Sequence, residues 1–483
     1  MAEKLIVRDR LLNKIFFKEF EHSSGFRIAA ICNRQVDPET YAAIGASLSR
    51  NPSPLRARLG ELTDLQKKRI IGRYFRDYGH NSVGEMGHLF LSVEDISMLA
   101  AMQLISFARF QGQEASTRYI DFSEVRYTLP SQMQEDQGVH DLMHAWFDLY
   151  SEVNERLVEH YVTKEGMKEG QARPRAFDIA GAFLPSAAKT SVVIACDIRN
   201  LIEHARKLRS YEGEEIQHIS RHLLAVIDHL CPNSVRSIDM EESVSNDTDR
   251  HAVSFFEGEL QRSFEGFRNS DPEPRWTLRP WELRPKLWGK TREEIIRLLR
   301  SEEVGRYGQV TCAGRVSFRS LRELMRHRPN VKIWSFAWRE RGTSSTPAWR
   351  DESETLYPPQ FCPWYLLRIP DTHQEGIRER VQQLMATTTA IGIESYVRTV
   401  GRKPAGVLLP MGAEVLFELT ATLDKWMYLL HLRSGLKVHP EVRNVIRSWG
   451  REICDGLGFE PEDLGLKYLE TPETDYGRRS KDA

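Results

Sequence analysis

The 483-residue sequence lacks several features that would assign it to a class of proteins directly. No stretch approaches 18 consecutive apolar residues, so we predict no membrane span. The first segment, Met1–Phe20, lacks the apolar centre of a signal peptide and spaces its charged and apolar residues as a helix would. Lys and Arg number 67 against 68 Asp and Glu, a net charge of -1 that argues against a histone-like or polybasic nucleic-acid binder.

Cysteine is scarce and scattered. There are six cysteines, no CxxC pair, and the two closest, Cys196 and Cys231, are 35 residues apart. This excludes a disulfide scaffold or a zinc ribbon and favours reduced thiols in a cytoplasm. The remaining composition, 41% hydrophobic and 10% aromatic without low-complexity tracts, is that of a globular protein, and the length predicts two or three domains.

A segment near the middle of the chain is rich in proline and tryptophan. Residues 270–290 hold four prolines and three tryptophans, and proline interrupts helices. We therefore predict an N-terminal half over 1–265, a linker strap over 266–290 and a C-terminal half over 291–483.

The two halves share a pattern. Residues 184–209 and 409–433 each begin with Leu-Pro and end with Leu-Arg, 25 and 24 residues later. We interpret both as apolar helices, each followed by a second helix, at 214–230 and 439–453. An internal repeat is the economical explanation.

Each half also has a helix upstream, at 97–107 and 318–327, leading into a polar loop. Strand signals are fewer, with alternation in 84–95 and a short extended piece at 125–130. We expect an α+β fold of two halves, each a small, mostly antiparallel or mixed sheet flanked by long helices.

The segment 78–130 carries a motif. Gly79-His80-x-Ser82-x-x-Glu85 is followed by Gln103-Leu104 and then by Glu114-x-Ser116-x-Arg118-Tyr119. This resembles the flavin-dependent thymidylate synthases, the ThyX family, whose signature is Gln-Leu-x-Arg-His-Arg-x-x-Ser-x-Asn-Glu-x-Ser-x-Arg-Tyr. The elements at 184–185, 197–199 and 208–209 are similar to the family's second part, so the resemblance spans roughly 60–235.

The sequence departs from the family at the basic tripeptide. Ser106-Phe107-Ala108 stands where the family has Arg-His-Arg, and Arg326-His327-Arg328 occurs instead in the second half. That half lacks Glu-x-Ser-x-Arg-Tyr but keeps Leu-Pro, Leu-Arg and a His-Pro-Glu segment. The signature thus looks divided between two halves of a tandem ThyX-like chain. The resemblance implies a homodimer that mimics the family's tetramer, with a composite competent site and a degenerate second one.

The resemblance implies FAD as cofactor, with NADPH and methylenetetrahydrofolate as co-substrates, and methyl transfer to the uracil ring of a pyrimidine nucleotide such as dUMP. The implied cofactor-binding residues are His80, Ser82, Glu85, Arg199, Arg326, His327, Arg328 and His439. The implied substrate-binding residues are Gln103, Glu114, Ser116, Arg118 and Tyr119. Arg209 or Arg433 would face the base and stabilise developing negative charge. Asp197 stands where the family has asparagine.

Other interpretations stay open. A tripeptide such as 326–328 also suits the end of a helix, where cations favour the macrodipole. His218 and His222 are one helical turn apart, but no glutamate follows as in a zincin motif, so we predict no metal site. The chain could be a degenerate nucleotide- or flavin-binding protein, or could modify uracil in a specialised nucleotide or a nucleic acid, which the neutral charge disfavours. The discriminating feature is whether 326–328 lies near 114–119.

Overall fold

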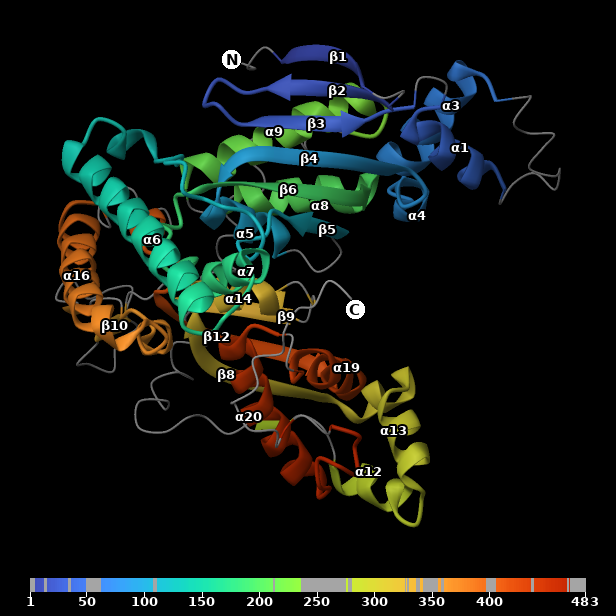
Figure 1. The fold of residues 1–483 in the computed structure, drawn as a ribbon. Helices are drawn as coiled ribbons and strands as arrows, with labels where there is room; N and C mark the ends of the chain where they lie inside the picture. The colour runs from blue at the N-terminus through green and yellow to red at the C-terminus, as the bar shows by residue number, and fades with distance from the viewer. Residues whose placement is uncertain are drawn as a thin grey trace. The chain divides into compact units, whose positions relative to one another are not determined.

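Two compact units make up the computed structural model of the chain (Figure 1), and neither is continuous in sequence. Unit 1 comprises 1–116, 126–135 and 187–255, and unit 2 comprises 117–125, 136–186 and 256–483. The structure describes residues 5–12, 15–33, 36–48, 62–106, 111–211, 213–235, 275–276, 280–325, 327, 330–335, 339–341, 355–357, 360–396, 405–435, 438–466 and 469.

Unit 1 contains a six-stranded antiparallel sheet. Its order is β1-β2-β3-β4-β6-β5. The strands are β1 Ile6–Leu12, β2 Ile15–Glu21, β3 Arg27–Ile31, β4 His88–Ser97, β5 Gln111–Glu114 and β6 Lys189–Asp197.

The N-terminal segment is a β-hairpin, and the expectation of helical spacing there is wrong. β1 pairs with β2 so that Asp9 lies opposite Lys18, and their side chains form an ion pair of 2.9 Å. Arg10 pairs diagonally with Glu19 at 2.7 Å. Opposite charges on neighbouring strands stabilise a hairpin, and this cross-strand pairing outweighs the helical pattern of the isolated segment.

Helices cover one face of the unit 1 sheet (Figure 1), chiefly α8 Ile198–Arg209 and α9 Glu214–Leu230. Alternate residues of β6, including Val192 and Ile194, are buried in the same core as the apolar stripe of α9. The other helical elements of this unit are α1 Pro38–Leu48, α3 Asp64–Ile70, η1 Ile71–Asp77, α4 Asn81–Gly84, α5 Met98–Ile105 and η2 Ser131–Met133.

Unit 2 has a four-stranded antiparallel sheet in the order β7-β8-β12-β9 and a two-stranded ribbon β10-β11. The strands are β7 Arg275–Trp276, β8 Gln309–Ser317, β9 Asn330–Ser335, β10 Arg339–Arg341, β11 Thr355–Tyr357 and β12 Glu414–Thr422. Within the expected linker, the structure describes β7 on this sheet and the whole helix α12 Pro280–Leu287; the predicted boundaries of the halves stay a prediction.

Helices make up most of the remainder of unit 2. They are α6 Gln137–Thr163, α7 Glu169–Ala180, α12 Pro280–Leu287, α13 Arg292–Leu299, η4 Glu302–Tyr307, α14 Phe318–Met325, α15 Pro363–Leu366, α16 Asp371–Thr389, η6 Ala390–Tyr396, η7 Gly406–Leu408, α19 Leu423–Arg433 and α20 Pro440–Leu457. Trp146 of α6 donates its indole hydrogen bond to Thr388 of α16 at 3.4 Å. In the described part of the chain, no helix combines the length and apolar character needed to cross a membrane.

The segments between Leu-Pro and Leu-Arg differ from expectation in their first part. Each begins as a strand, β6 or β12, and only the last 12 or 11 residues form a helix, α8 or α19. In β6, buried and half-buried residues alternate along a β-branched run, which suits a pleated sheet. The following helices end at Arg209 and Arg433, as predicted.

The same succession of elements occurs in both units. A strand (β4 or β8) runs directly into a helix (α5 or α14), and a later strand (β6 or β12) pairs antiparallel with the first and runs into two helices. A short strand after the first helix (β5 or β9) pairs with the other edge of β6 or β12. The mixed helices and antiparallel sheets confirm the α+β class, and this shared order supports the tandem arrangement, which remains a proposal.

Equivalent hydrogen bonds accompany the shared order. In unit 1 the Ser97 amide and hydroxyl donate to Glu215 at 2.8 and 2.6 Å. In unit 2 the Ser317 amide and hydroxyl donate to Glu441 at 2.6 and 2.5 Å. Both serine hydroxyls also accept from the amide three residues later, so each one caps its helix. The two serines therefore occupy equivalent positions in the two strand–helix pairs.

The two Leu-Pro elements meet inside unit 2. Pro185 and Pro410 form an antiparallel bridge, the Met411 amide donates to the Leu184 carbonyl at 2.7 Å, and the Ser186 amide donates to the Leu409 carbonyl at 2.7 Å. These paired segments place α7, which ends shortly before Leu184, next to β12.

Candidate functional site

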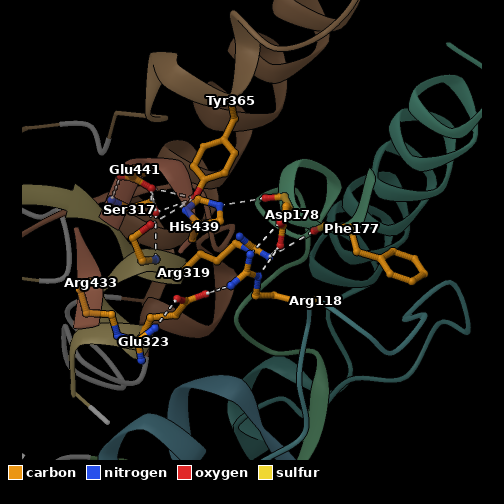
Figure 2. A network of polar contacts seen from close by, with 11 residues as sticks. Arg118, Phe177, Asp178, Ser317, Arg319, Glu323, Tyr365, Arg433, His439 and Glu441 are labelled. Atoms are coloured by element: carbon orange, nitrogen blue, oxygen red, sulfur yellow. Dashed lines mark hydrogen bonds and ion pairs between the residues drawn. The ribbon is translucent and has the colours of Figure 1, made fainter. Parts of the chain in front are cut away.

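A cluster of charged side chains lies inside unit 2 (Figure 2), and we call it the arginine cluster. Its members are Arg118, Asp178, Arg319, Glu323, His327, Arg433 and His439. They come from the 117–125 loop, α7, α14, the turn after α14, the end of α19 and the start of α20. Residues far apart in the sequence therefore share one site.

Arg118 and Asp178 form its tightest pair. Arg118 donates from Nε and Nη2 to the two Asp178 oxygens at 2.5 and 2.8 Å, a bidentate geometry. Burial opposes ionisation of Asp178, but Arg118 and its hydrogen bonds outweigh burial and lower the pKa of Asp178 to about 2. Burial likewise opposes the charge of Arg118, yet Asp178 and Glu323 raise the pKa of Arg118. Both groups are therefore charged at neutral pH.

The loop that carries Arg118 has a second anchor. The Tyr150 hydroxyl of α6 accepts the Phe122 amide at 3.1 Å and donates to Asp121 at 3.2 Å. Two helices of unit 2 thus hold this loop, α7 through Asp178 and α6 through Tyr150.

Glu323 lies between two arginines. One carboxylate oxygen is 3.7 Å from Arg118 Nη1, and the other is 3.5 Å from Arg433 Nη1 (Figure 2). Burial opposes ionisation of Glu323, but Arg118 and the other nearby cations lower its pKa, so it is a carboxylate at neutral pH. Glu323 therefore links Arg118 of the 117–125 loop to Arg433 at the end of α19.

Arg433 is held from a second side by His327. Its Nε donates to His327 Nε2 at 2.5 Å. Because Nε2 accepts this hydrogen bond, the neutral imidazole carries its proton on Nδ1. Of the tripeptide 326–328, His327 is thus connected to Arg118 through Arg433 and Glu323, while Arg326 and Arg328 lie outside the described residues.

Arg319 and His439 are the most buried members of the cluster. Arg319 is 3% exposed; its Nη2 donates to the Phe177 carbonyl at 3.2 Å and lies 3.8 Å from Asp178. His439 Nε2 hydrogen-bonds the Asp178 carbonyl at 3.0 Å, and burial lowers the pKa of His439 to about 4. Among the described residues, Arg319 Nε and Nη1 and His439 Nδ1 find no hydrogen-bond partner. The two Arg319 nitrogens fit an anionic ligand such as a phosphate-bearing cofactor, because a buried guanidinium keeps its positive charge.

A buried carboxylate supports the cluster from behind. Glu441, at the start of α20, accepts hydrogen bonds from Ser317, Ser320 and the Tyr365 hydroxyl, the last at 2.7 Å (Figure 2). Burial, with the Glu441 charge, raises the pKa of Tyr365 well above its usual value, so the phenol stays protonated as a donor. This network fixes α14, which carries Arg319 and Glu323, against α20.

The remaining predicted cofactor residues lie in unit 1. His80 and Ser82 are exposed at the turn into α4, where Gly79 has a φ of +68° that favours glycine. Glu85 forms an ion pair with Arg199, which also bonds Glu203 at 3.0 Å. The two predicted ligands Glu85 and Arg199 thus neutralise each other.

Asp197 is the N-cap of α8. It accepts the Asn200 amide at 2.9 Å and its side chain at 2.6 Å. Aspartate and asparagine are both good N-caps, so the departure from the family is accounted for by a structural role.

The other described residues that were predicted for the site belong to unit 1, with the exception of Tyr119. Gln103, Glu114, Ser116 and Arg209 belong to unit 1, where Glu114 and Arg209 are buried. Tyr119 belongs to unit 2 and is exposed. The structure therefore brings four predicted site residues together, namely Arg118, His327, Arg433 and His439.

His218 and His222 pack around a third histidine in unit 1. Their rings lie 5.2 and 5.1 Å from that of His22. No group of three or more His, Cys, Asp or Glu in the described segments could hold a metal ion.

Sequence reasoning missed Asp178, Arg319 and Glu323. One signal was present, because Glu323-Leu324-Met325 directly precedes Arg326-His327-Arg328 and so stands where the signature has Gln-Leu-x. Arg319 belongs to a basic stripe with Arg322, which is typical of a solvated helix face, but the structure buries both. No pattern marks Asp178, whose partner Arg118 is 60 residues away.

Part of the chain is similar to proteins of known family. The model of the family "Thymidylate synthase complementing protein" matches residues 31–233. The flavin-dependent thymidylate synthase of Clostridium tetani (strain Massachusetts / E88) is 22% identical over 202 residues, which cover 41% of this chain and 80% of that protein. The flavin-dependent thymidylate synthase of Thermococcus onnurineus (strain NA1) is 25% identical over 191 residues, 38% of this chain and 70% of that protein. Residues 31–233 of this chain are therefore similar to the flavin-dependent thymidylate synthases.

Proposed function

We propose that this protein is a flavin-dependent methyltransferase that acts on the uracil ring of a pyrimidine nucleotide such as dUMP. The observation that carries the proposal is the chain of contacts from Arg118 through Glu323 to Arg433 and His327. It joins the Glu-x-Ser-x-Arg-Tyr segment to the tripeptide that the first half lacks, which supports a composite site.

The proposed reaction balances as follows. The uracil C5 loses its proton and gains a methyl group, built from the methylene carbon of methylenetetrahydrofolate and a hydride. The two folate nitrogens that release this carbon take up the C5 proton and one proton from solvent, which gives tetrahydrofolate. FAD, once reduced by NADPH, supplies the hydride when bound. A cation beside the uracil carbonyl stabilises the charge that develops there, and Arg209 is the candidate, because Arg433 lies with Arg118 around Glu323.

The charged groups suit a phosphate-bearing ligand. Arg319 has two buried nitrogens without partners among the described residues and would hold a phosphate of the cofactor. The sequence resemblance assigns Arg326 and Arg328 to the same cofactor. Arg118, oriented by Asp178, would bind the nucleotide phosphate.

The proposal also includes a homodimer in a cytoplasmic setting. If each chain supplies two ThyX-like halves, a dimer would reproduce the family's tetramer. Light scattering of the purified chain measures this, and a monomer that is active would contradict the dimer.

The experiment uses the purified full chain. FAD is titrated and followed by its visible absorbance, NADPH is added to bleach the band, and thymidylate formation from dUMP and methylenetetrahydrofolate is followed by mass spectrometry. We expect FAD binding, bleaching and product, and a loss of about a hundredfold or more in turnover for Arg209→Ala. Arg173→Ala, at an exposed arginine of α7, is the control and should keep full activity.

A second function has an observation in its favour. Ser106-Phe107-Ala108 and the mutual pairing of Glu85 with Arg199 suggest a binding protein that kept a nucleotide or flavin pocket but lost catalysis. FAD binding without product would select this alternative, and the absence of FAD binding would contradict the flavoenzyme.

A further inference from the structure

Glu323 has an unusual position for a carboxylate in the arginine cluster. Its two oxygens face different guanidinium groups, Arg118 at 3.7 Å and Arg433 at 3.5 Å, and both contacts are longer than a strong charge-assisted hydrogen bond. The side chain is 12% exposed. Glu323 is thus a loosely held anion between two cations.

Each of the two arginines has an independent anchor. Arg118 is fixed by the bidentate bond to Asp178, and Arg433 is fixed by the bond of its Nε to His327. The two guanidinium groups would therefore keep their positions if the Glu323 carboxylate moved away.

The corresponding position in unit 1 holds an uncharged side chain. Glu323 lies six residues after Ser317, and Gln103 lies six residues after Ser97, the two serines that occupy equivalent caps. The family signature has glutamine there as well. The strand–helix framework therefore accepts glutamine, and it does not require the negative charge of Glu323.

We propose that Arg118 and Arg433 form a cradle for a phosphate-type oxyanion of a bound nucleotide, and that Glu323 occupies this cradle until the ligand displaces it. Carboxylate and phosphate present similar oxygen pairs to guanidinium forks, so one can replace the other. Glu323 is then the residue that sets how tightly the site holds an anion. The inference rests on the proposed function for the identity of the nucleotide.

A purely structural role for Glu323 leads to a different expectation. If the carboxylate only positioned Arg118 and Arg433, removing its charge would loosen both arginines and weaken anion binding. Asp178, which bonds Arg118 far more closely, has such a positioning role. The two carboxylates around Arg118 should therefore act in opposite directions.

The experiment compares Glu323→Gln, Asp178→Asn and the wild-type full chain by isothermal titration with inorganic phosphate, dUMP and deoxyuridine. We expect Glu323→Gln to bind phosphate and dUMP about fivefold more tightly or better, the lower end of usual charge–ligand coupling, with deoxyuridine unchanged. Asp178→Asn should bind dUMP more weakly by a similar factor. Glu94→Gln, which removes the carboxylate of the Arg27 ion pair in the unit 1 sheet, is the matched control and should match wild type.

Equal or weaker binding of phosphate and dUMP by Glu323→Gln would overturn the inference, as would an equal gain for deoxyuridine or no phosphate binding by either protein. The proposed function fails separately. If Glu323→Gln gains phosphate affinity but no variant binds FAD or dUMP, the cradle stands and the flavoenzyme does not. If wild type converts dUMP but Glu323→Gln gains no affinity for phosphate, the proposed function stands and the cradle does not.

Discussion

Unit 1 and unit 2 each contain a serine at the junction of a strand and a helix, which donates from its amide and its hydroxyl to a glutamate at the start of a later helix, α9 or α20. In unit 1, the described hydrogen bonds to the Glu215 carboxylate come from the amide and the hydroxyl of Ser97. Burial raises the pKa of Glu215. In unit 2, Glu441 receives hydroxyl groups from Ser320 and Tyr365 in addition to Ser317. The framework is the same, but in unit 2 it is embedded in a larger polar network.

The difference extends to the helix that follows each serine. α5 of unit 1 is apolar apart from the half-buried Gln103, whereas α14 of unit 2 buries Arg319, Arg322 and Glu323. One arrangement of backbone elements thus supports an apolar helix in one unit and a charged one in the other. The comparison teaches that the backbone order alone does not decide where the charged site forms.

The largest expected effect on stability comes from removing the two glutamates that accept hydrogen bonds from these serines. Glu441→Ala leaves several buried donors without an acceptor and should lower the free energy of unfolding by about 4 kcal/mol. Glu215→Ala removes the acceptor of Ser97 alone and should cost about 2 kcal/mol. Urea denaturation measures both, and equal losses would contradict the claim that the unit 2 network is the more extensive.

Asp178 belongs to unit 2 alone and should make that unit sensitive to acid. Its folded pKa of about 2 lies below the usual 3.8, so its contribution is complete above about pH 4 and lost as pH falls towards 2. Asp178→Asn should destabilise the protein by about 3 kcal/mol at neutral pH, because Arg118 loses its closest buried partner. The free energy of unfolding, measured between pH 2 and 7, should decrease less steeply at acid pH for the variant than for wild type. An unchanged pH dependence would contradict the low pKa of Asp178.

Each unit also buries a neutral histidine. Burial lowers the pKa of His204 in unit 1 to about 3 and that of His439 in unit 2 to about 4. The unfolded chain protonates these groups near pH 6.5, so stability should decline as pH drops below about 6.5, by roughly 2 kcal/mol for each histidine at pH 5. NMR titration should show neither imidazole changing charge between pH 6 and 8, and His439→Gln and His204→Gln should each flatten the decline.

The smallest effect tests the packing between α7 and Arg319. A Cβ at Gly181 would lie 2.8 Å from Arg319 Nε and 3.0 Å from the Phe177 carbonyl, so Gly181→Ala should cost about 1–2 kcal/mol by overpacking. Gly170, on the same helix, has nothing within 4 Å of a Cβ, and Gly170→Ala should raise stability by up to about 0.5 kcal/mol. Thermal unfolding distinguishes them, and a neutral Gly181→Ala would show that Arg319 is free to shift.

Local patterns in the sequence predicted the elements that depend on local physics. The apolar stripe from Ile216 to Leu230 predicted α9, and the helices ending at Arg209 and Arg433 were predicted because an apolar run closed by Leu-Arg is a local signal. The hairpin of β1 and β2 was not predicted, because each strand is stabilised by the strand it pairs with and not by its own residue pattern. The strands β6 and β12 were misread for the same reason.

In the candidate site, too, only the residues that belong to a local sequence motif could be predicted. The motif residues Arg118, His327, Arg433 and His439 could be named from the sequence, since the resemblance rests on residue types at fixed spacing. Asp178 and Arg319 could not, because nothing in the sequence near them indicates that α7 and α14 meet at Arg118.

The sequence by itself determined the α+β class, the helices α9 and α20 and the similarity of residues 31–233 to a known family, because composition, periodicity and motif spacing are local properties of the chain. Only the tertiary structure decided that the loop of Arg118 belongs with α7, α14 and α19, and that Glu323 lies between Arg118 and Arg433. Such contacts join residues separated by 60 positions or more, and their geometry depends on how whole helices pack.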